Sequence, residues 1–304
     1  MGKITCMKNK LFVIGNGFDL AHGLPTKFDP DFKNIARRYE QDNFWNLYQS
    51  REDDIWSDFE NLLGYPDFNA IEEIFYGYEP DYLSERERDR DAIIYQVELN
   101  GKLQDALYVF ADNAERALSN IQSNVLVRQI LDPDGYYLTF NYTHTLEYIY
   151  EIPGEQVLHI HGEVGENNLK LGYPKGKFLP EKYSYDIRGK GRGCYSEIEI
   201  EDYIVNIEDY YIRTAYEDLL EKCKSFYKDI RLDLLDEFLD EKRNIDEIIV
   251  YGHSCAIDFE YFGDIRERYP AAYWRFYVRG EEQKSNVNYL ITKYGINNLK
   301  IINI

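Results

Sequence analysis

The stretch Lys10–Gly23, KLFVIGNGFDLAHG, joins an uninterrupted apolar run to a turn that contains two glycines. The four consecutive apolar residues Leu11–Ile14 are typical of a strand that is buried on both faces of a parallel sheet. Gly15, Asn16 and Gly17 follow at once. Because glycine has no Cβ, this turn can be tight and can let an anion such as a phosphate approach main-chain N–H groups closely. The stretch therefore predicts a buried strand that ends in an anion-binding turn.

Buried strands and helical segments alternate along much of the remaining chain. Further strands are expected in the stretches YYLTF, QVLHIHGE, DEIIVYGHS, YWRFYVRG and LKIINI. Strands that alternate with helices indicate a mostly parallel sheet covered on both sides. The predicted fold class is therefore α/β, with a Rossmann-like sheet, flanking helices and large helical insertions.

The strands cluster in three segments of the chain. Residues 1–30, 132–175 and 244–304 are predicted to build one α/β nucleotide-binding domain. The helical insertions 31–131 and 176–243 are candidates for a second lobe. Within them, apolar positions trace one face of a helix over about 40 residues from Asp91, a length that calls for a break or a packing partner. Residues 176–200 lack a period and are expected to form a flap.

Charge and cysteine content narrow the function classes. The chain has 304 residues, of which 55 are Asp or Glu and 35 are Lys or Arg, for a formal net charge of -20. This balance repels nucleic acid and anionic lipid, so neither is an expected partner. No segment offers the roughly twenty apolar residues that span a bilayer, and four scattered cysteines form no C-x-x-C pair. A cytoplasmic protein with reduced thiols is predicted.

Four predicted strand exits are polar, namely Gly15–Asp19, Thr139–Thr143, His159–Glu163 and Gly252–Ser254. Ligands of open parallel sheets bind at the carboxyl ends of the strands, so these exits are expected to face one site. All five histidines of the chain fall in or just beyond them, at His22, His144, His159, His161 and His253. This distribution favours a functional site over a purely structural role.

Several residues at these exits have two interpretations. His159 and His161 share a strand face and could pair as metal ligands, but no third ligand is evident and no metal is assigned. His159 is interpreted as a packed core histidine, and His161 at the strand end as a general base. Asn141 either orients a sugar hydroxyl or a water, or caps the next helix. Asp19 is either a helix-start residue or a ligand contact.

The motifs IGNGFDLAHGLPT, TFNYTHTLE, HIHGE and YGHSCAIDFEYF occur in this order and closely resemble those of the AbiH family of bacterial phage abortive-infection proteins. AbiH proteins in turn look like distant sirtuin-like proteins, whose NAD site uses a glycine turn, a strand-end Asn, a His-Gly pair and a Gly-x-Ser turn. The resemblance implies an anti-phage effector that binds NAD as substrate or ligand and requires no further cofactor.

The resemblance also implies roles for individual residues. Asn141 and His161 match the reacting centre. The residues that match the cofactor-binding motifs are Gly15, Asn16, Gly17, Phe18, Asp19, Thr139, Gly252, His253, Ser254 and Asp258. Deacetylating sirtuins carry a four-cysteine zinc module that this chain cannot build. The implied enzyme is therefore an NAD glycohydrolase, a hydrolase that cleaves NAD to ADP-ribose and nicotinamide.

Two other functions would use the same residues. A non-catalytic sensor would bind NAD, ADP-ribose or a related nucleotide in the same pocket and switch a partner or an oligomer. A metal-dependent nuclease would draw on His159, His161 and the many carboxylates, although the acidic charge disfavours it. The partners expected for an abortive-infection effector are the nucleotide, further copies of the chain and a phage-derived trigger.

Overall fold

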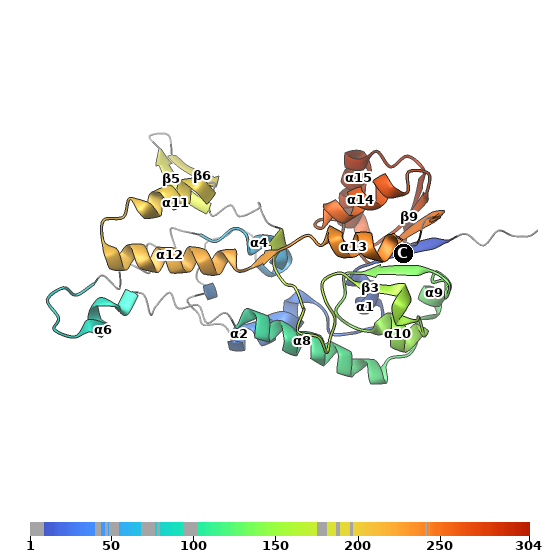
Figure 1. The fold of residues 1–304 in the computed structure, drawn as a ribbon, viewed down its shortest axis with the longest axis horizontal. Coiled ribbons are helices and arrows are strands. Elements are labelled where there is room, and N and C mark those ends of the chain that lie inside the picture. Colours follow the sequence, from blue (N-terminus) through green and yellow to red (C-terminus); the bar gives the residue numbers. More distant parts are fainter. Residues whose placement is uncertain are drawn as a thin grey trace, which may run out of the picture. The chain divides into compact units, whose positions relative to one another are not determined.

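The computed structural model describes residues 9–39, 44–45, 48, 55–67, 77, 80–93, 102–174, 181–186, 189–194, 197–240, 242 and 244–304. The chain divides into two compact units. The first, here called the sheet unit, consists of residues 1–27, 110–170 and 230–304. The second, the insertion unit, consists of residues 28–109 and 171–229. Both are drawn in Figure 1.

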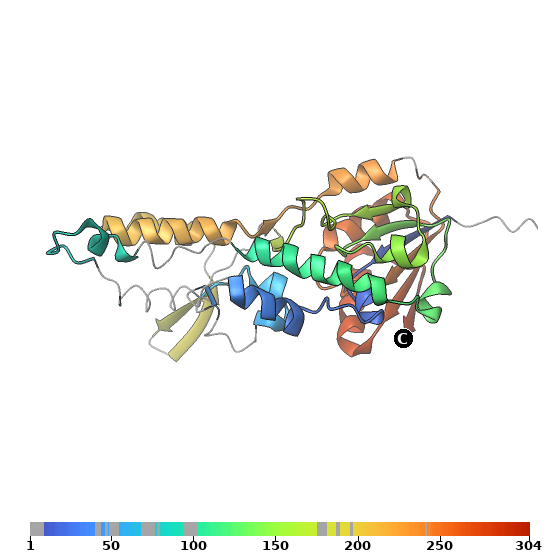
Figure 2. The ribbon, with the colours of Figure 1, turned by 90° about the horizontal axis from the view of Figure 1, so that it is seen from below.

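The sheet unit contains six parallel strands in the order β10-β9-β8-β1-β2-β3. They are β1 (Lys10–Ile14), β2 (Tyr136–Thr139), β3 (Val157–His159), β8 (Glu247–Tyr251), β9 (Tyr273–Val278) and β10 (Leu299–Asn303). The strand β1 pairs with β2 on one side and with β8 on the other, so the order of winding reverses between β1 and β8. Open α/β sheets bind ligands at such a reversal. The predicted α/β class with a parallel sheet is confirmed (Figure 2).

Successive side chains of β1 point to opposite faces of the sheet, and both faces are covered. Leu11 and Val13 pack in a core with residues of α13, α14 and α15, whereas Phe12 and Ile14 pack with residues of α1, α9 and α10. The helices are α1 (Gly17–Ala21), α9 (Val125–Arg128), α10 (Thr145–Tyr150), α13 (Leu232–Leu239), α14 (Phe259–Arg268) and α15 (Gly280–Tyr294). Figure 1 shows the two groups on either side of the sheet. Burial on both faces explains why Leu11–Ile14 carries no polar side chain.

The insertion unit is built mainly from helices and aromatic contacts. Its described elements are η1 (Phe28–Phe32), α2 (Lys33–Tyr39), η2 (Ile55–Ser57), α4 (Phe59–Leu62), α6 (Glu87–Arg90), β4 (Tyr173–Pro174), β5 (Glu181–Asp186), β6 (Gly189–Cys194), α11 (Glu197–Val205), α12 (Tyr210–Lys224) and β7 (Tyr227–Lys228). Trp56 and Phe59 stack with ring centroids 4.8 Å apart, and Phe32 packs edge-on to Phe59 at 5.3 Å. These aromatic side chains form a buried core.

The helical pattern that starts at Asp91 contains a break, as its length predicted: α8 (Leu103–Ala117) ends in the short helix η3 (Leu118–Asn120), and Ile121 is extended before α9 begins. The predicted flap at 176–200 contains the antiparallel pair of β5 and β6; this pair was not predicted, because β6, GKGRGC, carries no apolar alternation. Among the described residues, no helix combines the length and apolarity needed to cross a membrane.

Candidate functional site

The turns that follow β1 and β8 are in direct backbone contact. The amide of Gly15 donates to the carbonyl of the last residue of β8 at 3.0 Å, and that of Gly17 donates to the carbonyl of Gly252 at 2.8 Å. A Cβ on Gly15 would lie 2.5 Å from the Cα of His253, and one on Gly17 would lie 2.7 Å from the Cα of Gly252. These glycines are thus required by the packing of one turn on the other. Because the Gly15, Gly17 and Phe18 amides already donate within the protein, a phosphate here would need other donors.

Other residues assigned to the nucleotide site bond to the protein itself. The Asn16 amide nitrogen donates to the carbonyl of Thr26 at 2.6 Å, and the hydroxyl of Thr139 accepts the amide of Asn141 at 3.1 Å. Phe18 is buried in the core between the sheet and α1. These three side chains shape the exits of β1 and β2. Their contact with a nucleotide stays a prediction.

Asp19 is a buried carboxylate at the exit of β1. Its two oxygens accept hydrogen bonds from Thr143 at 2.6 Å and Thr145 at 2.9 Å. Burial raises the pKa of the Asp19 carboxyl to about 6, and hydrogen bonds from the two threonines and Asn141 offset only part of this effect. Thr143 and Thr145 thus hold the Asp19 carboxylate in place. A carboxyl group with this pKa can exchange a proton near neutral pH.

The raised pKa of Asp19 predicts a specific pH dependence of stability. Because the folded-state pKa exceeds the ordinary value of 3.8, ionised Asp19 disfavours the fold above about pH 6, and this cost disappears as the pH falls toward about 4. Asp19→Asn removes the titration. We therefore expect the free energy of unfolding of Asp19→Asn, relative to wild type, to rise by on the order of 1 kcal/mol from about pH 5 to about pH 7. Urea denaturation of both proteins measures this difference, and a pH-independent difference would contradict it.

Asn141 and His161 each bring an unsatisfied polar atom to neighbouring strand exits. The side chains are buried, and Asn141 Oδ1 and His161 Nε2 have no hydrogen-bond partner among the described residues. The amide of Asn141 also lowers the pKa of Asp19, which places its donor side toward that carboxylate. His161 Nε2 is 3.6 Å from Asp258 Oδ1, outside normal hydrogen-bond length. Asn141 does not cap the next helix, whose N-cap is His144.

The turn after β8 contributes three further residues of the predicted site. His253 Nδ1 accepts the amide of Cys255 at 3.0 Å, and the His253 ring packs on Phe140 with centroids 4.5 Å apart. Ser254 is exposed, and its hydroxyl accepts the amide of Ala256 at 3.3 Å. Asp258 is buried and takes a left-handed conformation with φ 60° at the start of α14. Of the three side chains, that of Asp258 is the one that faces His161.

A second polar cluster at the exits of β2 and β3 was not predicted from the sequence. His144 donates from Nδ1 to Glu115 at 2.9 Å and from Nε2 to Glu163 at 3.0 Å. These carboxylates raise the pKa of His144 to about 9, mainly through the hydrogen bond to Glu115. His159 is held by the carbonyl of Asn141 and by Glu147, each at 2.9 Å. The strand exits predicted the two histidines, but no local signal pairs His144 with Glu115, which is 29 residues upstream.

The comparisons with known proteins bear on this arrangement. A search of curated proteins found no match to the chain. The family model described as bacteriophage abortive infection AbiH matches residues 11–278. This range runs from β1 to β9 and includes all four polar strand exits. Membership in this family implies a role in abortive infection by phage. Because the model covers most of the chain, the protein belongs to the AbiH family of bacteriophage abortive infection proteins.

Proposed function

We propose that the protein binds NAD at the carboxyl edge of its sheet and hydrolyses the bond between nicotinamide and ribose. The observation that carries this proposal is the pair of buried, unsatisfied atoms, Asn141 Oδ1 and His161 Nε2. Leaving a buried polar atom without a partner costs about 1–3 kcal/mol, so two at adjacent strand exits point to a ligand that satisfies them. The reversal of winding between β1 and β8 supports a nucleotide at the same edge.

The reaction suits these residues. Nicotinamide leaves NAD as a neutral molecule, so the enzyme needs no strong acid and must stabilise an oxocarbenium-like transition state and position a water. Asn141 Oδ1 accepts a hydrogen bond from a ribose hydroxyl or from that water. His161 Nε2 accepts the proton that the attacking water releases. The carboxylate of Asp258 lies 3.6 Å from this nitrogen, beside the point where the proton is received.

Asp19 adds a third group to the proposed centre. Its buried carboxylate, held by Thr143 and Thr145, is the group toward which Asn141 directs its amide. A fixed negative charge stabilises positive charge that develops on the ribose in the transition state. In this proposal the glycine turns after β1 and β8 position Asp19 and the site rather than cradle the phosphates, because the Gly15 and Gly17 amides are engaged.

The proposal is tested by incubating the purified protein with NAD and following nicotinamide release, with and without extract from phage-infected cells as a source of trigger. Release of nicotinamide with ADP-ribose supports the glycohydrolase. Tight binding of NAD by calorimetry, with no release in the presence of the extract, identifies a nucleotide sensor instead. A protein that neither binds nor cleaves NAD under either condition rules out the glycohydrolase and a sensor of NAD itself.

A further inference from the structure

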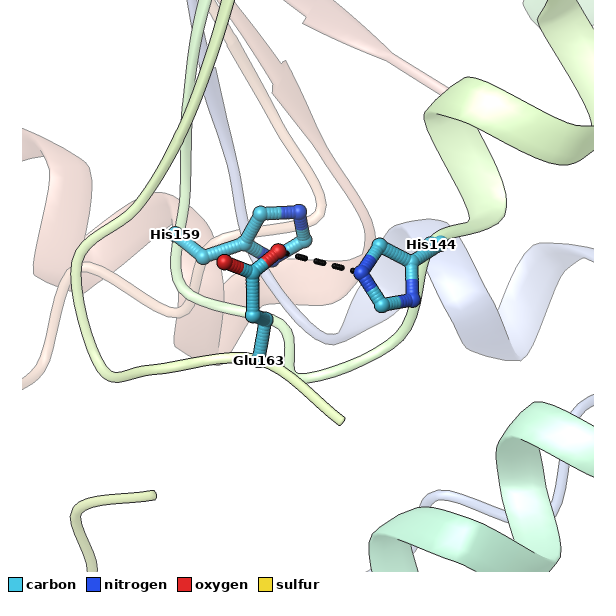
Figure 3. Close-up of side chains that lie close together, drawn as sticks. All are labelled: His144, His159 and Glu163. Carbon is cyan, nitrogen blue, oxygen red and sulfur yellow. Dashed lines mark hydrogen bonds and ion pairs between the residues drawn. The ribbon is translucent and has the colours of Figure 1, made fainter. Parts of the chain in front are cut away.

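Among the described residues, one group of histidine and carboxylate side chains could hold a single ion: His144, His159 and Glu163. One ligand atom from each lies within 4.8 Å of the other two, and Figure 3 shows the three side chains gathered at one point from separate segments. His144 Nε2 is 3.0 Å from Glu163 Oε2. Ligand atoms around a tetrahedral ion lie about 3.3–3.6 Å apart when the bonds are about 2.0–2.2 Å long. A bound ion would therefore draw the wider pairs together and hold His144 and Glu163 slightly farther apart.

The hydrogen bonds around the two imidazoles match those of metal-binding histidines. A ligating histidine almost always donates its second ring N–H to a carboxylate or a backbone carbonyl, which fixes the ring. His144 Nδ1 has this partner in Glu115, whose other oxygen accepts the amide of His144 at 3.0 Å. His159 has an acceptor at each nitrogen, the carbonyl of Asn141 and the carboxylate of Glu147. Whichever nitrogen of His159 binds an ion, the other is already held.

The donor set and its exposure indicate which ion fits. Two imidazoles and one carboxylate favour transition metals such as Zn²⁺, whereas Mg²⁺ and Ca²⁺ prefer oxygen ligands. The side chains of His144 and Glu163 are 21% and 38% exposed, so an ion can enter from solvent. Three protein ligands leave one position open for water, as in catalytic zinc sites. Glu147 Oε2, buried beside His159 and without a hydrogen-bond partner among the described residues, is a ready acceptor for such a water.

We propose that His144, His159 and Glu163 bind one divalent transition-metal ion of the Zn²⁺ type, with Glu115 as the positioning residue of His144. The site lies at the exits of β2 and β3 and differs from the predicted pairing of His159 with His161. The proposal goes beyond NAD hydrolysis, because it concerns other side chains and needs no nucleotide.

The test uses the full chain, freed of metal by a chelator and then titrated with Zn²⁺ in the absence of NAD. We expect binding of about one ion per chain, measured by calorimetry and by metal analysis after gel filtration. His144→Ala, His159→Ala and Glu163→Gln should each weaken binding by at least about tenfold, and Glu115→Gln by about 10–100-fold. Glu166→Gln, an exposed carboxylate in the same loop as Glu163, is the matched control and should bind as wild type does.

The outcomes separate a built site from adventitious binding. Equal Zn²⁺ affinity in wild type and in Glu163→Gln, or no stoichiometric binding by wild type, overturns the proposal. Glu163→Gln is the decisive variant because its partly exposed side chain can be changed without opening the core. Circular dichroism shows whether the two histidine variants fold. Neither result depends on NAD turnover, so failure of the metal site and failure of the proposed function are distinguishable.

Discussion

Gly252→Ala is expected to destabilise the sheet unit by on the order of 2–5 kcal/mol, a large share of the 5–15 kcal/mol that holds a typical domain. Two costs add at this position. Gly252 has φ 71°, a left-handed conformation that costs an alanine roughly 1–2 kcal/mol. In addition, the new Cβ would lie 2.7 Å from the carbonyl carbon of Gly17, and this backbone atom cannot move without displacing the whole turn after β1. Urea denaturation followed by circular dichroism measures the loss.

Two other glycines separate these costs. Gly23 also has a positive φ, 77°, but a Cβ there would meet nothing within 4 Å, so Gly23→Ala should lose only the conformational part, about 1–2 kcal/mol. Gly15 is not in the left-handed region, yet its Cβ would lie 2.5 Å from the Cα of His253, so Gly15→Ala reports the overlap alone. If Gly252→Ala lowers the free energy of unfolding by no more than Gly23→Ala does, the close packing of the two turns does not require glycine at these positions.

The fold was predictable where burial leaves a strong pattern in the chain. Leu11–Ile14 is apolar throughout because its two faces lie in two different cores. The start of α15 was not predictable: the helix begins at Gly280, but its first turns, GEEQKSN, are polar and carry no apolar period before Val287. The position of β1 between β2 and β8 was not predictable either, because strand order depends on tertiary packing rather than on local sequence.

The location of the candidate site was predictable from the sequence, but the hydrogen-bond partners of its residues were not. The rule that ligands bind at the carboxyl ends of parallel strands placed Asn141 and His161 among the site residues before their burial was known, and the family resemblance implied Asp258. The partners of Asp19, however, are the hydroxyls of two threonines more than 120 residues away, Thr143 and Thr145. A threonine after a strand is typical of a helix cap, and only the fold distinguishes a cap from a residue that holds a distant carboxylate.

The sequence also could not separate a structural histidine from a candidate site histidine. His22 is buried, its ring hydrogen-bonded to the carbonyl of Phe18 and the hydroxyl of Tyr150, which makes it structural. His161 Nε2, by contrast, is buried without a hydrogen-bond partner among the described residues. Both stand near predicted strand exits, so sequence position alone could not rank them. The hydrogen bonds distinguish the two residues. A buried polar atom is normally paired, so the unpaired nitrogen of His161 makes it the better candidate for a ligand contact.

Asn141→Ala and His161→Ala are each expected to lower the rate of nicotinamide release by about 10²–10⁴-fold, the range that a positioned proton acceptor contributes. The double variant should lose little more than the worse single variant, because residues that act on one transition state are not additive. Asp258→Asn should have a smaller effect, because in this proposal Asp258 acts on the reaction through His161, 3.6 Å away. Asn120→Ala, which changes an exposed asparagine, is the matched control for Asn141→Ala.

Phage challenge of bacterial cells that express each variant connects this chemistry to defence. If nicotinamide release is what aborts infection, plaque counts should rise for Asn141→Ala and His161→Ala and stay low for Asn120→Ala, at equal protein levels. Protection that survives in the double variant while NAD cleavage is lost would separate defence from hydrolysis and leave the nucleotide as a signal. If the double variant cleaves NAD at the wild-type rate, the reaction does not depend on Asn141 or His161. Both residues would then lie outside the reacting centre.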